Sequence, residues 1–286
     1  MPSKAAVIDI GSNSIRYLGR GGEKRLITTR LAESIVETGR LSDAAIARSI
    51  DALSFFASLA AEEGLKPYAY ATSAVRDADD ESRSRFLTLA GAIMPVRVLS
   101  GDEEARLALI GAGIADKEDW GLIDLGGGSC QLVSASFATS APMGCVRAKD
   151  ICSACGSNEL SSLKQAVFSS CEGLFVFPRI RMEDWIGVGG TITTLAALSL
   201  GLETYDAHAV ENSALTIESI ERLMRSLFDI GDEKRRQIPL LAKRHDVIIP
   251  GALVLLYAMR GMGIRTLHPS NADGMEGYRK YIEADI

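Results

Sequence analysis

The sequence predicts an α/β protein in which two similar domains flank a cleft. Three observations lead to this fold class. Segments with helical periodicity alternate with short apolar runs typical of strands, an apolar run that ends in aspartate, glycine and serine occurs twice, and the length of 286 residues suits about two domains. Alternation of this kind favours helices layered on mostly parallel sheets.

The first half of the chain is predicted to begin with three strands and to continue with helices and strands in alternation. Ser42 and Asp43 can accept hydrogen bonds from free backbone N–H groups, so a helix is expected to begin there. The predicted strands cover 5–10, 15–18, 25–30, 68–71 and 96–99, and the predicted helices cover 44–63, 79–90 and 103–115.

The second half repeats this outline. Its predicted strands cover 120–125, 131–136, 185–188 and 265–267, and its predicted helices cover 158–174, 191–200, 217–228 and 246–262. Since no low-complexity linker separates the halves, we expect two closely packed domains, at 1–116 and 117–272, with a C-terminal helix of about 273–286 that packs back onto the first domain.

The composition argues against several classes of protein. Charged residues make up 24% and hydrophobic residues 47% of the chain, which is far from the composition of a disordered segment. The formal charge of −6 argues against general adhesion to nucleic acid or to anionic membranes, so neither is an expected partner. The start of the chain lacks the basic and apolar regions of a signal peptide, and a cytoplasmic protein is expected.

The most informative feature is a motif that follows two predicted strands. It reads Asp9-Ile10-Gly11-Ser12-Asn13-Ser14 in the first domain and Asp124-Leu125-Gly126-Gly127-Gly128-Ser129 in the second. Glycines let backbone N–H groups approach a phosphate closely, neighbouring hydroxyls add donors, and an aspartate at a strand end can hold Mg²⁺ against phosphate oxygens. One such turn is usually structural, but the pair predicts two facing loops that clamp one phosphate chain.

These motifs, with a third at Gly189-Gly190-Thr191, resemble the superfamily of actin, sugar kinases and heat-shock ATPases. Within it, four further stretches resemble the exopolyphosphatase and guanosine pentaphosphate phosphohydrolase family. They read ATSAVRDA (71–78), SGDEEARLALIGA (100–112), MGCVRAKD (143–150) and RHDVIIPGALVL (244–255). The resemblance runs from Ala5 to about Gly277 and implies two actin-like (ribonuclease H-like) domains that flank an interdomain cleft.

The resemblance also implies catalytic residues for phosphate hydrolysis. Glu104 matches the family's catalytic base, Arg76 matches a phosphate-binding arginine, and Asp124 matches the carboxylate associated with magnesium. Without the resemblance, Glu104 would be interpreted as an acidic residue at a solvated helix start, and Arg76 as one partner of a surface ion pair.

The phosphate-binding residues implied by the resemblance come from all three loops. They are Gly11, Ser12, Asn13, Ser14, Gly126, Gly127, Gly128, Ser129, Gly190 and Thr191. Metal ligation is assigned to Asp124 and Asp9, with Gln131 at a position where family members usually carry glutamate. The expected cofactor is Mg²⁺, with Mn²⁺ as an alternative, and the amide of Gln131 is expected to weaken this site because it lacks the negative charge.

Two further departures from the family pattern bear on activity. Met275 stands where arginine is common, and the sequence carries neither the HD-type helical domain nor the additional C-terminal domain of the long members. His245-Asp246 lacks the other spaced ligands of an HD metal centre and is interpreted as an ordinary helix start. The chain therefore resembles the short, two-domain members, for which we expect weaker processivity on long polyphosphate.

Two other clusters of side chains allow more than one interpretation. Cys145, Cys152, Cys155 and Cys171 fall within one stretch, but the pattern lacks the second pair or the histidines typical of zinc sites. Structural thiols are the favoured interpretation, with a metal or iron–sulfur site and a redox pair as alternatives. Residues 222–265 carry nine basic and four acidic side chains, which indicates either a polyanion-steering surface or solvated helix faces.

Three functions are compatible with these residues. The leading hypothesis is a magnesium-dependent hydrolase that releases terminal phosphate from inorganic polyphosphate or guanosine pentaphosphate, with water activated by Glu104. The second is a weakly active or non-catalytic sensor of polyphosphate or of guanosine penta- or tetraphosphate, which the amide of Gln131 motivates. The third is a kinase of the same superfamily. The expected partners are these phosphates and a second copy of the chain in a homodimer.

Overall fold

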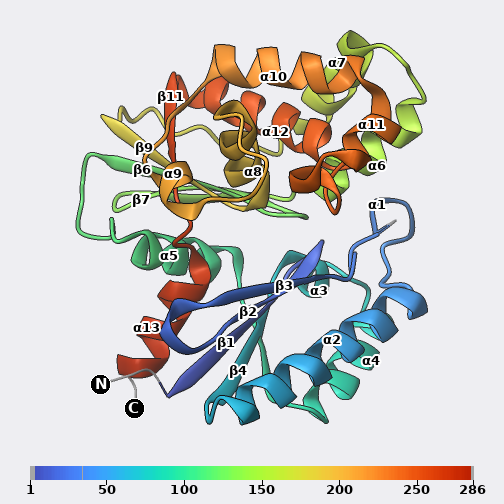
Figure 1. The fold of residues 1–286 in the computed structure, drawn as a ribbon, viewed down its shortest axis with the longest axis vertical. Coiled ribbons are helices and arrows are strands. Elements are labelled where there is room, and N and C mark those ends of the chain that lie inside the picture. The colour runs from blue at the N-terminus through green and yellow to red at the C-terminus, as the bar shows by residue number, and fades with distance from the viewer. Residues whose placement is uncertain (1–3, 34, 285–286) are drawn as a thin grey trace.

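Two mixed β-sheets form the framework of the molecule, one in each domain (Figure 1). The computed structural model describes residues 4–33 and 35–284. In the first sheet, the order β3-β2-β1-β4-β5 corresponds to Lys24–Thr28, Ser14–Leu18, Ala5–Ile10, Lys66–Ala71 and Val96–Val98. In the second sheet, the order β10-β11-β9-β6-β7-β8 corresponds to Leu215–Thr216, Thr266–Pro269, Asp184–Val188, Trp120–Leu125, Cys130–Ser134 and Ala138–Ala141.

The two sheets share one arrangement around a central strand. β1 pairs antiparallel with β2 and parallel with β4, and β6 pairs in the same way with β7 and β9. The hairpins β1–β2 and β6–β7 therefore occupy equivalent positions in their domains. The predicted fold class, α/β with two similar domains, is confirmed.

The long helix α2 (Asp43–Glu62) packs against the first sheet. Ser42 caps it by accepting a hydrogen bond from the backbone N–H of Ala45 at 3.2 Å, and buried side chains such as Leu53 and Phe56 face the sheet. By length and composition alone, it is the one helix among the described residues that could cross a membrane, but its packing makes it a core helix. The same domain contains α1 (Ile35–Thr38), α3 (Ser73–Arg76), α4 (Asp80–Gly91) and a 3-10 helix at Arg20–Gly22.

The second domain is built around a buried helix, α12 (Ile248–Met262). This helix contacts α6, α7, α8 and α10, and eleven of its residues are buried, which explains its almost wholly apolar sequence. The other helices of the domain are α6 (Cys145–Cys155), α7 (Leu160–Cys171), α8 (Gly190–Ser199), α9 (Ala207–Glu211), α10 (Ile217–Asp229), α11 (Gly231–Gln237) and a 3-10 helix at Pro239–Leu241.

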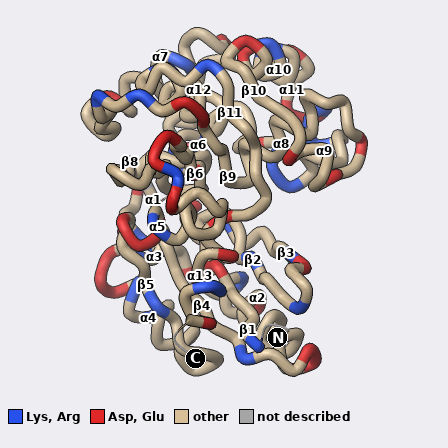
Figure 2. Tube along the Cα trace, turned by 90° about the vertical axis from the view of Figure 1, so that its left-hand side faces the viewer, with Lys and Arg blue, Asp and Glu red and all other residues tan. Residues whose placement is uncertain are grey.

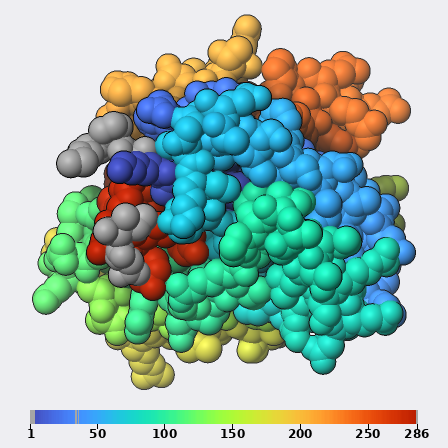
Figure 3. All heavy atoms as spheres, turned by 90° about the horizontal axis from the view of Figure 1, so that it is seen from below, coloured from blue at the N-terminus to red at the C-terminus, as the bar shows by residue number. Residues whose placement is uncertain are grey.

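Two helices cross at the boundary between the domains. α5 (Gly101–Ala112) contacts strands of the second sheet, and α13 (Gly274–Ala284) contacts β1 of the first. Their backbones approach so closely that a Cβ on Gly111 would lie 1.8 Å from the carbonyl oxygen of Asp273. In Figure 3 the red atoms of α13 lie among blue and green atoms of the first half of the chain. The crossing fixes the position of Asp273 relative to α5, the helix that carries Glu104.

Most predicted elements occur, with shifts at their ends. α5 ends at Ala112, before the predicted residue 115, because Gly113 adopts the left-handed conformation (φ 70°) that closes the helix. α6 was not predicted, and neither were β8 and several short helices. The last residues of the predicted C-terminal helix, 285 and 286, lie outside the described residues. Because α5 packs on the second sheet although it precedes residue 117, the exact domain limits stay a prediction.

Candidate active site between the domains

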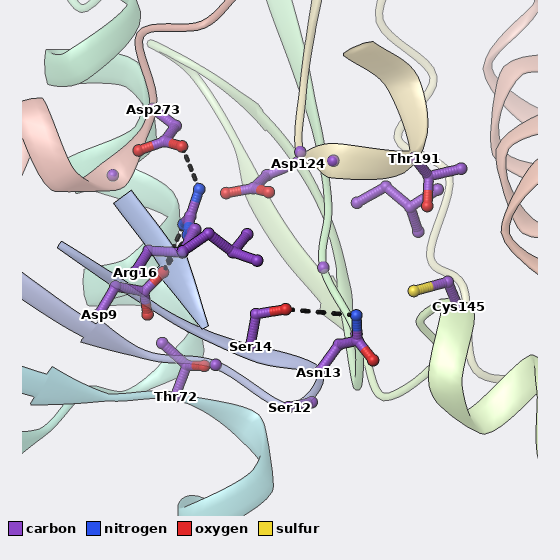
Figure 4. A pocket seen from close by; sticks show the side chains of 18 of the residues that line it. Asp9, Ser12, Asn13, Ser14, Arg16, Thr72, Asp124, Cys145, Thr191 and Asp273 are labelled. Atoms are coloured by element: carbon purple, nitrogen blue, oxygen red, sulfur yellow. Dashed lines mark hydrogen bonds and ion pairs between the residues drawn. The ribbon is translucent and has the colours of Figure 1, made fainter. Parts of the chain in front are cut away.

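A cavity of about 250 Å³ lies between the two hairpins (Figure 4). Its wall includes most of the residues that the sequence predicts for a site: Asp9, Gly11, Ser12, Asn13, Ser14, Glu104, Asp124, Gly126, Gly127, Ser129, Gly190 and Thr191. Three predicted residues, Arg76, Gly128 and Gln131, do not line it. The cavity therefore brings together groups from four separate parts of the sequence.

The two hairpin loops close in the same way. The backbone N–H of Gly11 donates to the carbonyl of Ser14 at 3.2 Å, and that of Gly126 donates to the carbonyl of Ser129 at 3.0 Å. Their tips meet at the cavity, since a Cβ on Gly127 would lie 2.7 Å from the Cβ of Ser12. The convergence of the two loops that the paired motif predicted is present in the structure.

Gly128 is needed for this contact rather than for the cavity wall. A Cβ at this position would lie 2.6 Å from the hydroxyls of both Ser12 and Ser73, which themselves share a hydrogen bond of 3.0 Å. The glycine therefore lets the second loop approach the first domain. Its predicted direct phosphate contact stays a prediction.

At the third loop, Gly189-Gly190-Thr191, the side chain of Arg244 packs against the backbone and reaches the cavity. Gly189 has φ 105°, and a Cβ on Gly190 would lie 2.3 Å from the guanidinium of Arg244, which lines the cavity. No hydrogen bond or ion pair of this guanidinium occurs among the described residues, and burial lowers its pKa. The guanidinium still keeps its charge at neutral pH. An uncompensated positive charge here favours an anionic ligand.

The basic segment 222–265 contributes to the cavity through Arg244 alone among the described residues. Other members of the segment form ion pairs on the outer helices, as Arg236 does with Asp232 and Arg260 with Glu221. Figure 2 shows acidic and basic segments interleaved around α10 and α11. These pairs favour the interpretation of solvated helix faces for most of the segment. Sequence reasoning included Arg244 in the segment but gave it no role.

Arg16 is a site residue that the sequence analysis missed. Its Nε donates to Oδ2 of Asp9 at 2.8 Å, and its guanidinium also pairs with Asp273 (Figure 4). Burial raises the pKa of Asp9, although Arg16 opposes this effect. Burial acts in the same direction on Asp273, but Arg16 and Lys24 outweigh it and lower its pKa. Asp9 and Arg16 are register partners on β1 and β2, so the predicted hairpin could have identified this pair.

Asp124 occupies the equivalent place in the second hairpin but has no such partner. No hydrogen bond or ion pair of its carboxyl group is found within 4–33 and 35–284, and Figure 4 shows it directed into the cavity. Burial raises the pKa of Asp124 to about 8, and the carboxylates of Glu104 and Asp273 add to this effect. A cation beside this group would oppose the shift, because it favours the ionised carboxylate.

Glu104 lies in the first turn of α5, where a capping box of Ser100 and Glu103 begins the helix. Burial raises the pKa of Glu104 to about 7, against the opposing effect of Arg76. Nη1 of Arg76 donates to Oε2 of Glu104 at 3.1 Å and to the carbonyl of Leu99 at 3.0 Å. Arg76 therefore lies behind Glu104, along a neighbouring cavity, and not at the wall of the main one. The arrangement places a carboxyl group suited to proton transfer at neutral pH inside the cavity.

Gln131 is the register partner of Asp124 and is fully buried. Its Nε2 donates to the hydroxyl of Ser129 at 2.9 Å, whereas its Oε1 has no partner. The amide therefore supports the loop of the second hairpin and adds no charge near Asp124.

The carboxylates of the cavity fit a divalent cation bound mainly through a ligand's phosphates. Oδ1 of Asp9 is buried without a partner, and Asp124 is equally unpaired. Among the described residues, no group of three or more histidine, cysteine or acidic side chains is close enough to hold a metal alone. Mg²⁺ typically takes one or two carboxylates together with phosphate oxygens, and the cavity supplies the carboxylates of this donor set.

The cysteine cluster is dispersed in the structure. Cys145 and Cys171 are buried on different helices, and Cys155 is exposed. Burial raises the pKa of Cys152 and of Cys171 to about 12, which keeps both as thiols. Among the described residues, no group of three or more potential metal ligands includes them. Their interpretation as structural thiols fits this environment.

Comparison with known proteins identifies the family. A model of the Ppx/GppA phosphatase family matches residues 8–281. The chain belongs to this family. Exopolyphosphatase 2 of Mycobacterium tuberculosis is 31% identical to this chain over an alignment of 312 positions, which covers 96% of this chain and 97% of that protein. This membership supports a phosphatase and gives no support to the kinase hypothesis.

Solved structures agree with this assignment to the Ppx/GppA family. An exopolyphosphatase-like protein matches with a TM-score of 0.85 and 25% identity, over 97% of this chain and 99% of that chain. The Aquifex aeolicus member of the Ppx/GppA family matches with a TM-score of 0.75 and 25% identity, over 100% and 99% of the respective chains. The resemblance stated from the sequence motifs is confirmed.

Proposed function

We propose that this Ppx/GppA protein hydrolyses the terminal phosphoanhydride of inorganic polyphosphate or of guanosine pentaphosphate. One observation carries the proposal: Glu104, with its pKa raised to about 7, lines a cavity between two glycine hairpins. A general base is most effective when its pKa lies near the working pH. The family and the relative named Exopolyphosphatase 2 support a phosphate-releasing reaction.

The two loops bind the end of the phosphate chain in this proposal. The backbone nitrogen of Asn13 lies at the junction of the hairpins, 3.0 Å from where a Cβ on Gly127 would be, and the Ser129 hydroxyl in the cavity wall adds a donor. Arg244 neutralises charge on the second side of the cavity. Such contacts fix the terminal phosphorus relative to Glu104, and positioning is the main contribution an enzyme makes to phosphoryl transfer.

Hydrolysis then requires one proton transfer. The water oxygen attacks the terminal phosphorus, its proton passes to the Glu104 carboxylate, and the bond from phosphorus to the bridging oxygen breaks, so that the shortened chain leaves with the electron pair. Arg76 acts behind Glu104, because its hydrogen bond of 3.1 Å orients the carboxylate and favours the ionised form. We assign Arg76 this orienting role in place of the predicted phosphate contact.

The expected cofactor is Mg²⁺, which would be held by Asp124, with the unpaired Oδ1 of Asp9 as a second acceptor. When bound, it supplies neutralisation of phosphate charge. Asp124 and Asp9 come from equivalent strand ends, so a chain clamped by the two loops passes between them.

Phosphate release from polyphosphate and from guanosine pentaphosphate, with Mg²⁺ or Mn²⁺, tests the proposal. Wild-type protein is expected to release orthophosphate from at least one substrate, and Glu104→Gln to be slower by about 10²–10⁴-fold because it cannot accept the proton. Asp102→Asn, an exposed neighbour on the same helix, should keep wild-type rates. Equal rates for Glu104→Gln and wild type would reject Glu104 as the base.

The sensor hypothesis rests on the amide of Gln131 and has its own test. Gln131→Glu places a carboxyl group beside Asp124 and Ser129, so the Mg²⁺ concentration for half-maximal activity should fall. A sensor would bind the phosphates without turnover in either form. The homodimer and the cytoplasmic location stay predictions.

A further inference from the structure

Tyr70 is a cavity residue that the mechanism above leaves without a role. It lies on β4 next to the central strand of the first sheet, in register with Asp9, which in turn is in register with Arg16. The three side chains therefore form a row across one face of the sheet, and all three line the cavity. The phenol of Tyr70 therefore lies in the part of the cavity wall that also contains the Asp9 carboxylate.

The hydroxyl of Tyr70 has no hydrogen-bond partner among the described residues although the residue is only 3% exposed. It lies near the start of α13, where a Cβ on Gly274 would be 3.6 Å from it. The ring is held against Tyr278 with a centroid distance of 4.7 Å. Buried tyrosine hydroxyls normally find a partner, so this one is free to bind a molecule that enters the cavity.

The charged groups around the Tyr70 hydroxyl determine which kind of molecule it can bind. Burial raises the pKa of Tyr70 well above its ordinary value, and the Asp9, Asp273 and Glu104 carboxylates add to this while Arg16 opposes it. The phenol therefore keeps its proton throughout the neutral range. The basic groups Arg16 and Lys24 on this side are already paired with carboxylates, so this point favours a neutral water over an anionic phosphate oxygen.

We propose that Tyr70 orients the attacking water beside Glu104, an assignment that rests on the proposed hydrolase function. A phenol has one O–H donor and two acceptor lone pairs, so the Tyr70 oxygen, unpartnered among the described residues, can accept a hydrogen from a water in the cavity. One hydrogen of the water is then directed to the Glu104 carboxylate, which takes it as a proton, and the other to the Tyr70 oxygen. The lone pair of the water that attacks phosphorus stays free.

Tyr70→Phe tests this assignment because it removes the hydroxyl and keeps the ring against Tyr278. We expect kcat for polyphosphate hydrolysis to fall by about ten- to hundredfold with KM unchanged, because the hydroxyl touches the water and not the chain. Tyr68→Phe is the matched control, since Tyr68 lies two residues earlier on the same strand face but does not line the cavity. Both variants should melt within a few degrees of wild type.

The outcomes separate this inference from the proposed function. A Tyr70→Phe protein with wild-type kcat, or with a raised KM at unchanged kcat, would overturn the water-orienting role while leaving the hydrolase intact. Absence of phosphate release by the wild type itself would overturn the proposed function and this inference together. Tripolyphosphate affinity of a folded Tyr70→Phe variant, measured by calorimetry, should equal that of wild type, and a weaker affinity would assign the hydroxyl to the substrate.

Discussion

The two hairpins of this molecule share a backbone and differ in electrostatics. Both place an aspartate at the end of a central strand, and both close with a bond between glycine and serine. In the first, the cross-strand partner of Asp9 is Arg16, and the pair is completed by Asp273. In the second, the partner of Asp124 is the neutral Gln131. In the first hairpin, the charge of Asp9 is compensated by Arg16. In the second, the carboxylate of Asp124 has no basic partner among the described residues and is open to a cation.

The largest effect expected from this difference is on catalysis. Asp124→Asn should lower kcat by about 10³-fold at saturating Mg²⁺, because it removes the open carboxylate and with it several kcal/mol of charge stabilisation. Asp116→Asn, an exposed change at the domain junction, serves as the control. Steady-state phosphate release measures both variants. A kcat of Asp124→Asn within about fivefold of wild type would show that the open carboxylate of the second hairpin is not needed for catalysis.

The contact between the hairpins gives the next effect. Gly127→Ala would place a Cβ 2.7 Å from that of Ser12 and 3.0 Å from the backbone nitrogen of Asn13, so the loops must separate. Activity should fall by about 10²-fold because the reacting groups are displaced. Gly126→Ala is the matched change, since its Cβ would lie an ordinary 3.5 Å from the Ser129 carbonyl. Equal activities of the two variants would show that the contact is dispensable.

Stability without metal should separate the two aspartates. Asp9→Asn leaves the partly buried Arg16 with a weakened partner and should lower the free energy of unfolding by roughly 2–3 kcal/mol. Asp124→Asn removes an unpaired, partly buried acid and should leave stability in EDTA unchanged or raised at pH 8. Urea unfolding measures both. A larger loss for Asp124→Asn than for Asp9→Asn would mean that Asp124 has a favourable partner in the folded state.

The contribution of Asp124 to the free energy of unfolding without metal should decrease as the pH rises. The folded pKa of Asp124 is about 8, above its ordinary value of 3.8, so the folded state holds this proton more tightly than the unfolded chain does. Its contribution to stability is therefore complete below pH 3.8 and is lost as the pH rises towards 8. In the Asp124→Asn variant, the free energy of unfolding should not show this decrease between pH 3.8 and about 8.

The smallest effect concerns the charge of Arg76, which lies behind Glu104, the proposed base. Arg76 lowers the pKa of Glu104, so Arg76→Met should raise it and move the acidic limb of the kcat/KM profile to higher pH. The loss at pH 7 should be less than about tenfold and should recover in alkaline buffer. Arg85→Met, at an exposed ion pair with Asp43, should leave the profile in place. If the acidic limb of the kcat/KM profile of Arg76→Met stayed at the wild-type pH, Arg76 would have no influence on the ionisation of Glu104.

The sequence was sufficient for the parts of this site that depend on short motifs. Gly127 follows from a local pattern, Glu104 was found only through the family resemblance, and alternating periodicity predicted both sheets. Asp273 and Arg244 were missed because they reach the cavity only through tertiary packing, by the crossing of α5 with α13 and by the approach of Arg244 to Gly190. Residue type alone also could not show that Arg76 lies behind Glu104, since that depends on where its guanidinium is bound. α6 carried no helix-start signal, since Gly144 precedes it and no side chain caps its first turn.

The most direct test of the open second hairpin is the Mg²⁺ dependence of tripolyphosphate binding. Calorimetry on Glu104→Gln protein avoids turnover. Affinity should rise as Mg²⁺ is added to this variant, and the rise should disappear when Asp124→Asn is combined with it. A Mg²⁺-dependent rise of equal size in the double variant would contradict the account.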